Sequence, residues 1–178
     1  VKDIQRHKTV HMEIAVKFFL HVSYQGKDYW FGPNLKDRLD LKLEHLINHQ
    51  IAISDKLSKY EIHEKHILLK GRIFEYSASL SKPLCWLTID DFKKINDNES
   101  HWVILDKSFW LAEIDDAKTH FLANDILSKQ ALESRISAEE NHATCIAQLI
   151  NNTECRRLFI VPDNWEEKAI QTLEQSSD

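Results

Sequence analysis

The chain has 178 residues, of which 43% are apolar, and a formal net charge of −5. This length suits one domain with a sizeable core, and the acidic balance disfavours a nucleic-acid binder that works through bulk positive charge, while leaving room for a local basic groove. The chain has no apolar run of about 18 residues, so we expect no membrane span. With no export signal visible, we expect a cytoplasmic protein.

The numbers and positions of the cysteines and glycines exclude further classes of protein. The three cysteines, Cys85, Cys145 and Cys155, are odd in number and lack CxxC spacing, which favours reduced and mostly buried thiols over a disulfide framework or a zinc ribbon. Only three glycines occur, and they are scattered along the chain. P-loop and dinucleotide-binding enzymes need clustered glycines where backbone amides approach phosphates, so these two enzyme types are excluded.

The first half of the chain predicts strands followed by a helix. Residues 1–5 and 10–23 alternate apolar and polar positions, which predicts a hairpin with a polar turn between the two strands. A short strand is expected over residues 28–31 after a turn that contains glycine. Asn34 is expected to cap a helix that runs to about residue 50, with an acidic residue in its first turn.

The second half predicts further strands and helices. Thr88 and Asp91 resemble a capping box for a helix that ends near residue 95. The remaining elements are expected as a short helix over 54–64, a strand over 66–78, one or two strands within 101–114, helices over 124–136 and 138–151, a strand over 156–162 and a helix over 163–175. The sequence therefore predicts a single α/β (α+β) domain over residues 1–178, with a mixed central sheet flanked by helices.

The strand over residues 10–23 carries an unusual charged face. Its even positions from Val10 to Phe18 are apolar, whereas its odd positions include His11, Glu13 and Lys17. Residues two apart on a strand share a face at about 6.5–7 Å, and residues four apart lie about 13 Å away from each other. The charged face either meets water, with at most a structural salt bridge, or lines a site. The apolar residues that share this face favour a partly covered surface, where pKa shifts become useful.

The hairpin suggests a metal site beside this face. A turn centred between His7 and Lys8, or on Lys8, places Asp3 opposite Met12 or Glu13. In the second register two carboxylates would stand about 4.5–5.5 Å apart at their β-carbons and would repel each other unless a cation lay between them. Mg²⁺ is commonly held by one or two carboxylates and water, so Asp3 and Glu13 are candidate Mg²⁺ ligands. The alternative for Asp3 is an ordinary polar residue near a turn.

Several long motifs identify a family. The stretches are "HMEIAVKFF", "YWFGPNLKDRLDLKLEHLINHQ", "LKGRIF", "FWLAE" and "RLFIVPDNW". With them the chain resembles, over nearly its whole length, an uncharacterised bacterial domain-of-unknown-function family (number 1853). Members of that family carry a Gly-Glu-[Leu/Val]-Asp-Phe strand shortly before the His-x-Glu strand. This sequence starts after the place where that strand would stand, so we expect an N-terminally incomplete fragment of a longer protein.

The same pattern is distantly similar to the PD-(D/E)XK restriction-endonuclease-like superfamily. That resemblance implies a nuclease-like core without its N-terminal part and Mg²⁺-dependent phosphodiester hydrolysis on DNA or RNA. Glu13 would bind the metal, Lys17 would position water and His11 would assist. Two departures weigh against catalysis: Ala15 stands where the acid of Glu-x-Lys belongs, and the upstream aspartate is missing. The alternative is a catalytically inactive relative that acts as a binding or structural module. The sequence does not predict the oligomeric state.

Overall fold

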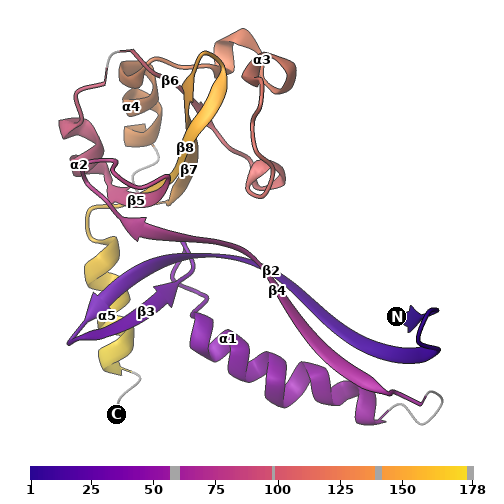
Figure 1. The fold of residues 1–178 in the computed structure, drawn as a ribbon. Helices are drawn as coiled ribbons and strands as arrows, with labels where there is room; N and C mark the ends of the chain where they lie inside the picture. Colours follow the sequence, from indigo (N-terminus) through magenta and orange to yellow (C-terminus); the bar gives the residue numbers. More distant parts are fainter. Residues whose placement is uncertain (57–60, 98, 139–141, 176–178) are drawn as a thin grey trace.

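The computed structural model describes residues 1–56, 61–97, 99–138 and 142–175. These residues form a mixed sheet of eight strands in the order β1-β2-β4-β5-β8-β7-β6, and β3 also pairs with β2. Helices pack against this sheet (Figure 1), which confirms the predicted α/β class with a mixed central sheet. The strands are β1 (Lys2–Asp3), β2 (Lys8–Tyr24), β3 (Lys27–Phe31), β4 (Glu64–Tyr76), β5 (Leu84–Thr88), β6 (His101–Ile104), β7 (Thr144–Ile150) and β8 (Thr153–Val161).

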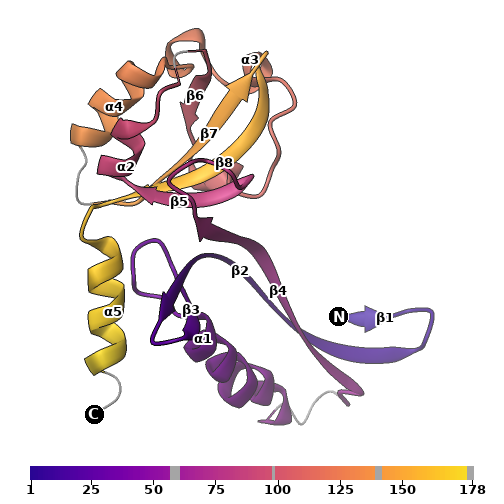
Figure 2. The same ribbon diagram turned by 60° about the vertical axis from the view of Figure 1, so that its left-hand side comes forward.

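The helical elements are mostly short. They are α1 (Leu39–His45), the π-helix η1 (Leu46–Gln50), the 3₁₀-helices η2 (Ile51–Lys56), η3 (Lys107–Phe109) and η4 (Ala123–Asp125), and the α-helices α2 (Ile89–Lys94), α3 (Ala117–His120), α4 (Lys129–Ala138) and α5 (Trp165–Gln175). In Figures 1 and 2, α1 runs along β2 and β4, while α5 and the N-terminus lie on opposite sides of the molecule.

The long strand β2 organises the first half of the chain. It has 17 residues and pairs in parallel with β4 from Val10 to Leu20 and antiparallel with β3 from Leu20 to Tyr24. Gln25 and Gly26 join β2 to β3, and both have positive φ. A two-residue hairpin turn needs this conformation to match the twist of the strands that it joins. The predicted pair of strands with a glycine turn is confirmed here.

The helix after the hairpin begins later than predicted. The side chain of Asn34 accepts a hydrogen bond from the Lys36 amide at 3.1 Å, and Leu35 has a φ of 61°. Asn34 therefore stabilises a local turn instead of capping a helix, a known competition for asparagine side chains. Helical structure starts at Leu39 and continues through η1 to Gln50, close to the expected end, but a 3₁₀-helix, η2, follows directly from Ile51.

Two other helix predictions have different outcomes. The short helix expected over residues 54–64 corresponds in part to η2, which ends at Lys56, and residues 57–60 lie outside the described part of the chain. The capping box is confirmed, because the Thr88 hydroxyl accepts a hydrogen bond from the Asp91 amide at 3.1 Å at the start of α2.

The helix predicted over residues 138–151 is wrong. Residues 144–150 form β7, which turns into β8 through Asn151 and Asn152. These asparagines have φ values of 52° and 65°, a left-handed conformation that asparagine tolerates better than most residues. The Asn-Asn pair between two apolar runs was the hairpin signal, and the apolar run by itself did not distinguish a buried strand from a helix.

The strands β5, β7 and β8 carry the core on both of their faces. Neighbouring residues of β8 belong to opposite clusters: Phe159 packs with Trp86 and Trp165, whereas Leu158 packs with Trp102 and Leu132. α2 and α4 contribute to the second cluster, and α5 contributes to the first. This arrangement explains the nearly continuous apolar stretches in these three strands, which are typical of strands covered on two sides.

Two further findings concern the cysteines and the possibility of a membrane span. Cys85 and Cys145 are buried, Cys155 is exposed, and all three are free thiols. In the described residues, no helix is both long enough and apolar enough to cross a lipid bilayer.

Candidate functional site

The charged face of β2, which consists of His11, Glu13 and Lys17, points toward the protein. Their side chains are 20%, 25% and 28% exposed, respectively. The apolar residues on the other face are more open, and Ile14 is 56% exposed. Met12 and Val16, which share this apolar face, are exposed as well. The sequence pattern identified two faces correctly, but the charged face is the one that is covered.

Glu13 and Lys17 have different partners in the structure. The Lys17 ammonium donates a hydrogen bond to Asp37 Oδ2 at 2.8 Å, in the loop before α1. The Glu13 carboxylate faces His11 Nε2 at 3.9 Å, and the structure records no ion pair between Glu13 and Lys17 in the described residues. Glu13 and Lys17 are four residues apart on the strand, so their Cα atoms lie about 13 Å apart and each charged group contacts a different residue.

The predicted position of Asp3 is wrong. Asp3 pairs with Lys8 in the β1–β2 register, and neither Met12 nor Glu13 lies opposite it. The turn is earlier than we expected because the Asp3 carboxylate accepts the Arg6 amide at 3.0 Å and His7 adopts a φ of 55°. Asp3 also forms an ion pair with the Arg6 side chain at 3.7 Å. A protein cation therefore compensates the charge of this carboxylate.

The carboxylate that lies near this end of β2 is Glu64, at the start of β4. It accepts a hydrogen bond from the Lys8 ammonium at 2.5 Å and lies 3.1 Å from His66 Nε2 and 3.9 Å from Arg6. The Lys8 hydrogen bond, supported by His66, lowers the pKa of Glu64 to about 2. Side-chain cations thus flank the Asp3 and Glu64 carboxylates at this end of β2.

We expect Glu64 to remain ionised in acid. Its pKa in the folded chain lies below the ordinary value, so its stabilising contribution is present above pH 4.5 and is lost as the pH falls toward 2. The measurement is an NMR titration of the Glu64 side-chain carbonyl carbon. Lys8→Met should raise the midpoint toward the ordinary value. A wild-type midpoint near 4.5 would contradict the ion pairing described above.

The structure gives no geometric support to a Mg²⁺ site at Asp3 and Glu13. Within the described ranges, no three histidine, cysteine, aspartate or glutamate side chains come together as potential metal ligands. The donors nearest to Asp3 are cationic, and Mg²⁺ prefers oxygen ligands. Mg²⁺ binding by Glu13 and Asp3 therefore stays a prediction from the sequence.

A cavity opens where the charged face of β2 ends. Its volume is about 860 Å³, and it lies between β2, the loop before α1, η3 and the start of α5. Four lysines and one histidine line it, whereas the carboxylate of Asp37 is its one acidic lining group among the described residues. The lining also includes two tryptophans. The chemically relevant lining residues are Lys17, Lys36, Asp37, Lys107, Trp110, His142, Trp165 and Lys168. We call this space the Lys17 cavity.

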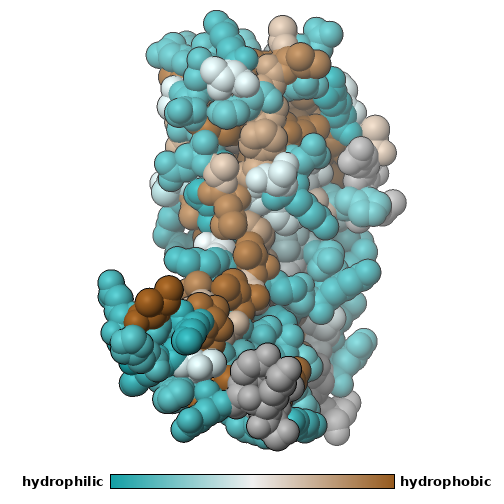
Figure 3. Space-filling view, turned by 90° about the vertical axis from the view of Figure 1, so that its right-hand side faces the viewer, coloured by the Kyte–Doolittle hydropathy of each residue, from teal (hydrophilic) through white to brown (hydrophobic). Residues whose placement is uncertain are grey.

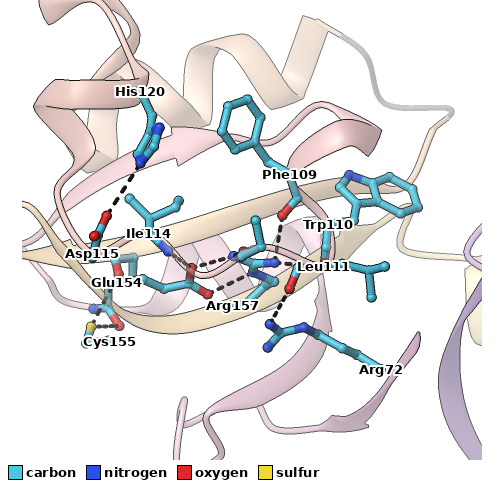
Figure 4. A network of polar contacts seen from close by, with 12 residues as sticks. Arg72, Phe109, Trp110, Leu111, Ile114, Asp115, His120, Glu154, Cys155 and Arg157 are labelled. Carbon is cyan, nitrogen blue, oxygen red and sulfur yellow. Dashed lines mark hydrogen bonds and ion pairs between the residues drawn. The ribbon is translucent and has the colours of Figure 1, made fainter. Parts of the chain in front are cut away.

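A buried arginine that the sequence analysis missed supports one wall of this cavity. Arg157, in β8, is 0% exposed, and its guanidinium donates to the carbonyls of Phe109, Trp110 and Ala112 at 2.6–2.8 Å. It also forms a two-pronged ion pair with Glu154 (Figure 4). A second arginine, Arg72 of β4, donates to the Leu111 carbonyl at 2.9 Å.

These hydrogen bonds hold the segment that carries Lys107 and Trp110. A run of consecutive carbonyls, 109–112, points at two guanidinium groups, as Figure 4 shows. Trp110 then packs edge-to-face on Phe18 of β2, with ring centroids 5.1 Å apart. The sequence signal was an arginine inside the apolar strand "RRLFIVP", since a buried charge needs partners that the strand itself does not supply.

The fold and the cavity define a mixed α/β protein with a basic, tryptophan-containing cavity beside a long central strand. The chain matches the family described as Domain of unknown function (DUF1853) over residues 1–161 and therefore belongs to that family. No curated protein and no solved structure matches the chain.

Proposed function

We propose that this chain is a binding module for single-stranded nucleic acid and that the Lys17 cavity is its binding site. The observation that carries the proposal is the charge of the lining: four lysines and a histidine against one carboxylate. Asp37 is already neutralised by Lys17, at 2.8 Å. The remaining charges favour an anionic ligand, and phosphate groups are the common anions that lysines bind in this way.

Three of these lysines are available for phosphates. Lys36, Lys107 and Lys168 are exposed, and within the described residues no carboxylate forms an ion pair with them. Trp110 is partly exposed beside them. A basic groove with an aromatic side chain is the arrangement that single strands use, because bases stack on the ring while phosphates contact the cations. The overall charge of −5 confines the attraction to this local surface.

Binding to a fluorescein-labelled oligothymidylate should depend on salt. Three phosphate contacts predict a slope of about −2 in a plot of log affinity against log salt concentration, so affinity should fall about 15-fold between about 50 and 200 mM salt. Changing Lys36, Lys107 and Lys168 together to glutamine should remove most of this slope. The measurement is fluorescence anisotropy at several salt concentrations.

The matched control is Lys118→Gln, because Lys118 is exposed and does not line the cavity. It should bind as the unchanged chain does. The proposal fails if the triple variant keeps the wild-type affinity, or if the unchanged chain does not bind the oligonucleotide at low salt.

Phosphodiester hydrolysis is a second candidate, favoured by the position of Glu13 and Lys17 on one partly covered face next to the cavity. The same oligonucleotide, incubated with Mg²⁺ or Mn²⁺ and run on a gel, distinguishes the two. Cleavage that Glu13→Ala abolishes would support the nuclease. A bound strand that stays intact supports the inactive relative, which is the function that the separation of Glu13 from Lys17 favours.

A further inference from the structure

The Lys17 cavity contains one carboxylate that the binding of phosphates does not require. Asp37 is its one acidic lining group among the described residues, and its side chain is 36% exposed, so a ligand in the cavity reaches it. A carboxylate repels a phosphate nearby, so a cavity that bound phosphates alone would bind them better without this residue. The carboxylate suits a different part of a ligand, one that donates a hydrogen bond.

Asp37 and Lys17 together present both an acceptor and donors. Asp37 Oδ2 accepts a hydrogen bond from the Lys17 ammonium at 2.8 Å, whereas in the part of the chain that the structure describes no group donates to Oδ1. Asp37 is also the one partner recorded for Lys17 among these residues, and an ammonium has three N–H donors. A free acceptor beside free donors is the complement of a hydroxyl group, which both donates and accepts.

The backbone holds Asp37 in place before a ligand binds. The Gly32 amide donates a hydrogen bond to the Asp37 carbonyl at 2.8 Å, which closes the loop of residues 32–37 at its base. The Trp165 indole donates to the Pro33 carbonyl at 2.7 Å and ties this loop to α5. A carboxylate held in this way loses little conformational entropy on binding, which favours discrimination between similar ligands.

We propose that Asp37 and Lys17 bind the 2′-hydroxyl of a ribose, so that the Lys17 cavity prefers RNA to DNA. This inference rests on the proposed binding of single strands. The hydroxyl donates to Asp37 Oδ1 and accepts from the Lys17 ammonium. Proteins distinguish RNA from DNA by this hydroxyl, and carboxylates bind ribose hydroxyls in dinucleotide-binding proteins. Lys36, the neighbour of Asp37, also lines the cavity, so a phosphate on Lys36 brings its own ribose close to the carboxylate.

The discrimination is confined to one ribose, because Asp37 has one free oxygen. Along β2, Val16 lines the cavity and is followed on the same face by Ile14 and Met12, and all three are exposed. Figure 3 shows apolar side chains as a band along one face of the molecule. Apolar side chains accept no hydrogen bonds from sugars, so we expect the RNA preference to stop growing with strand length once the cavity is filled.

The first test compares strands that differ in the sugar alone. They are a fluorescein-labelled oligouridylate and the oligodeoxyuridylate of the same length, and their binding to the full chain is measured by fluorescence anisotropy at low salt. A hydrogen bond to a charged group predicts at least about tenfold tighter binding of the RNA. An oligouridylate with fluorine in place of each 2′-hydroxyl should bind like the DNA, because fluorine keeps the sugar conformation of RNA but donates no hydrogen bond.

The second test removes the carboxylate. Asp37→Ala should lower the ratio of RNA affinity to DNA affinity to about one, while DNA affinity stays the same or rises because a negative charge leaves the cavity. The ion pair with Lys17 is partly exposed, so we expect the variant to fold, and thermal unfolding checks this. If it does not fold, the fluorinated strand tests the same hydrogen bond on the unchanged chain.

The matched control is Asp40→Ala. It removes an equal charge from an exposed residue of α1 that does not line the cavity, so the ratio of RNA affinity to DNA affinity should not change. A strand with a single deoxyuridine at its 3′ end shows which ribose is bound. Affinity equal to that of the RNA assigns an internal nucleotide, and affinity equal to that of the DNA assigns the diol at the 3′ end. Both results support the inference.

Three results would overturn this inference. They are equal binding of RNA and DNA, binding of the fluorinated strand as tight as that of the RNA, and an unchanged affinity ratio in the Asp37→Ala variant. Each of them leaves the proposed binding of single strands in place, because the strands still bind. If neither RNA nor DNA binds at low salt, the proposed function fails and this inference fails with it.

Discussion

Arg157→Met is expected to destabilise the chain by about 3–5 kcal/mol, because it leaves Glu154 as a buried carboxylate without its cation. The Glu154 side chain is 10% exposed, and the substitution also removes the donors to the carbonyls of Phe109, Trp110 and Ala112. The loss of a charged donor from these three carbonyls adds to the cost of the unpaired carboxylate. The measurement is equilibrium unfolding in urea at neutral pH.

The neighbouring residue provides the control for this prediction. Arg156 is only partly buried, and it contacts Gln148 and the Lys82 carbonyl at the edge of β8. Arg156→Met should therefore destabilise the chain by about 1 kcal/mol. The double variant Arg157→Met with Glu154→Leu should recover part of the loss, because it removes the uncompensated charge. If Arg157→Met unfolds at the same urea concentration as Arg156→Met, the guanidinium does not have the role assigned to it.

Gly71→Ala is the second substitution for which we expect a large effect. It should lower the free energy of unfolding by about 4 kcal/mol or more, which is exceptional for a single substitution. Gly71 has a φ of 149°, which residues with a side chain rarely adopt. A β-carbon there would overlap the carbonyl oxygen of Lys17 and lie 2.7 Å from its carbonyl carbon. Lys17 is the register partner of Gly71, so the strands β2 and β4 would have to separate beside the Lys17 cavity.

Gly26 is the matched control for this substitution. It also has a positive φ, of 73°, but no atom lies within 4 Å of a β-carbon added there. Gly26→Ala should therefore reveal only the conformational preference, about 1 kcal/mol. Thermal unfolding followed by circular dichroism compares the two variants. Similar transition temperatures would show that the close approach of the two strands does not matter. The β2–β4 register is continuous through Gly71, so the glycine permits contact between the strands without a bulge.

The sequence predicted those parts of the fold that depend on local chemistry. The alternation of apolar and polar residues predicted β2, the glycine turn predicted the hairpin with β3, and Thr88 predicted the start of α2. The predictions failed where two local structures compete. The Asn34 carboxamide bonds to a nearby amide in a turn as readily as it caps a helix, and the apolar run of β7 has no period that separates a buried strand from a helix.

The candidate site was harder to predict because long-range pairing decides it. The sequence showed that His11, Glu13 and Lys17 share a face. It did not show that Lys17 would form an ion pair with Asp37, or Asp3 with Arg6. The turn lies about two residues earlier than expected, which places Asp3 opposite Lys8 and away from Glu13, since strand register amplifies errors in turn position. The guanidinium of Arg157 and the cavity it supports depend on segments about 45 residues apart in the sequence.

The alternation along β2 makes the length of this strand more critical than its composition. Odd residues turn their backbone toward β4 and their side chains toward the protein, while even residues do the reverse. Inserting or deleting one residue within the strand would exchange both assignments along everything that follows, so lysine would meet solvent and isoleucine would meet Asp37. Evolution of this strand is therefore expected to tolerate substitutions and to reject changes in residue number.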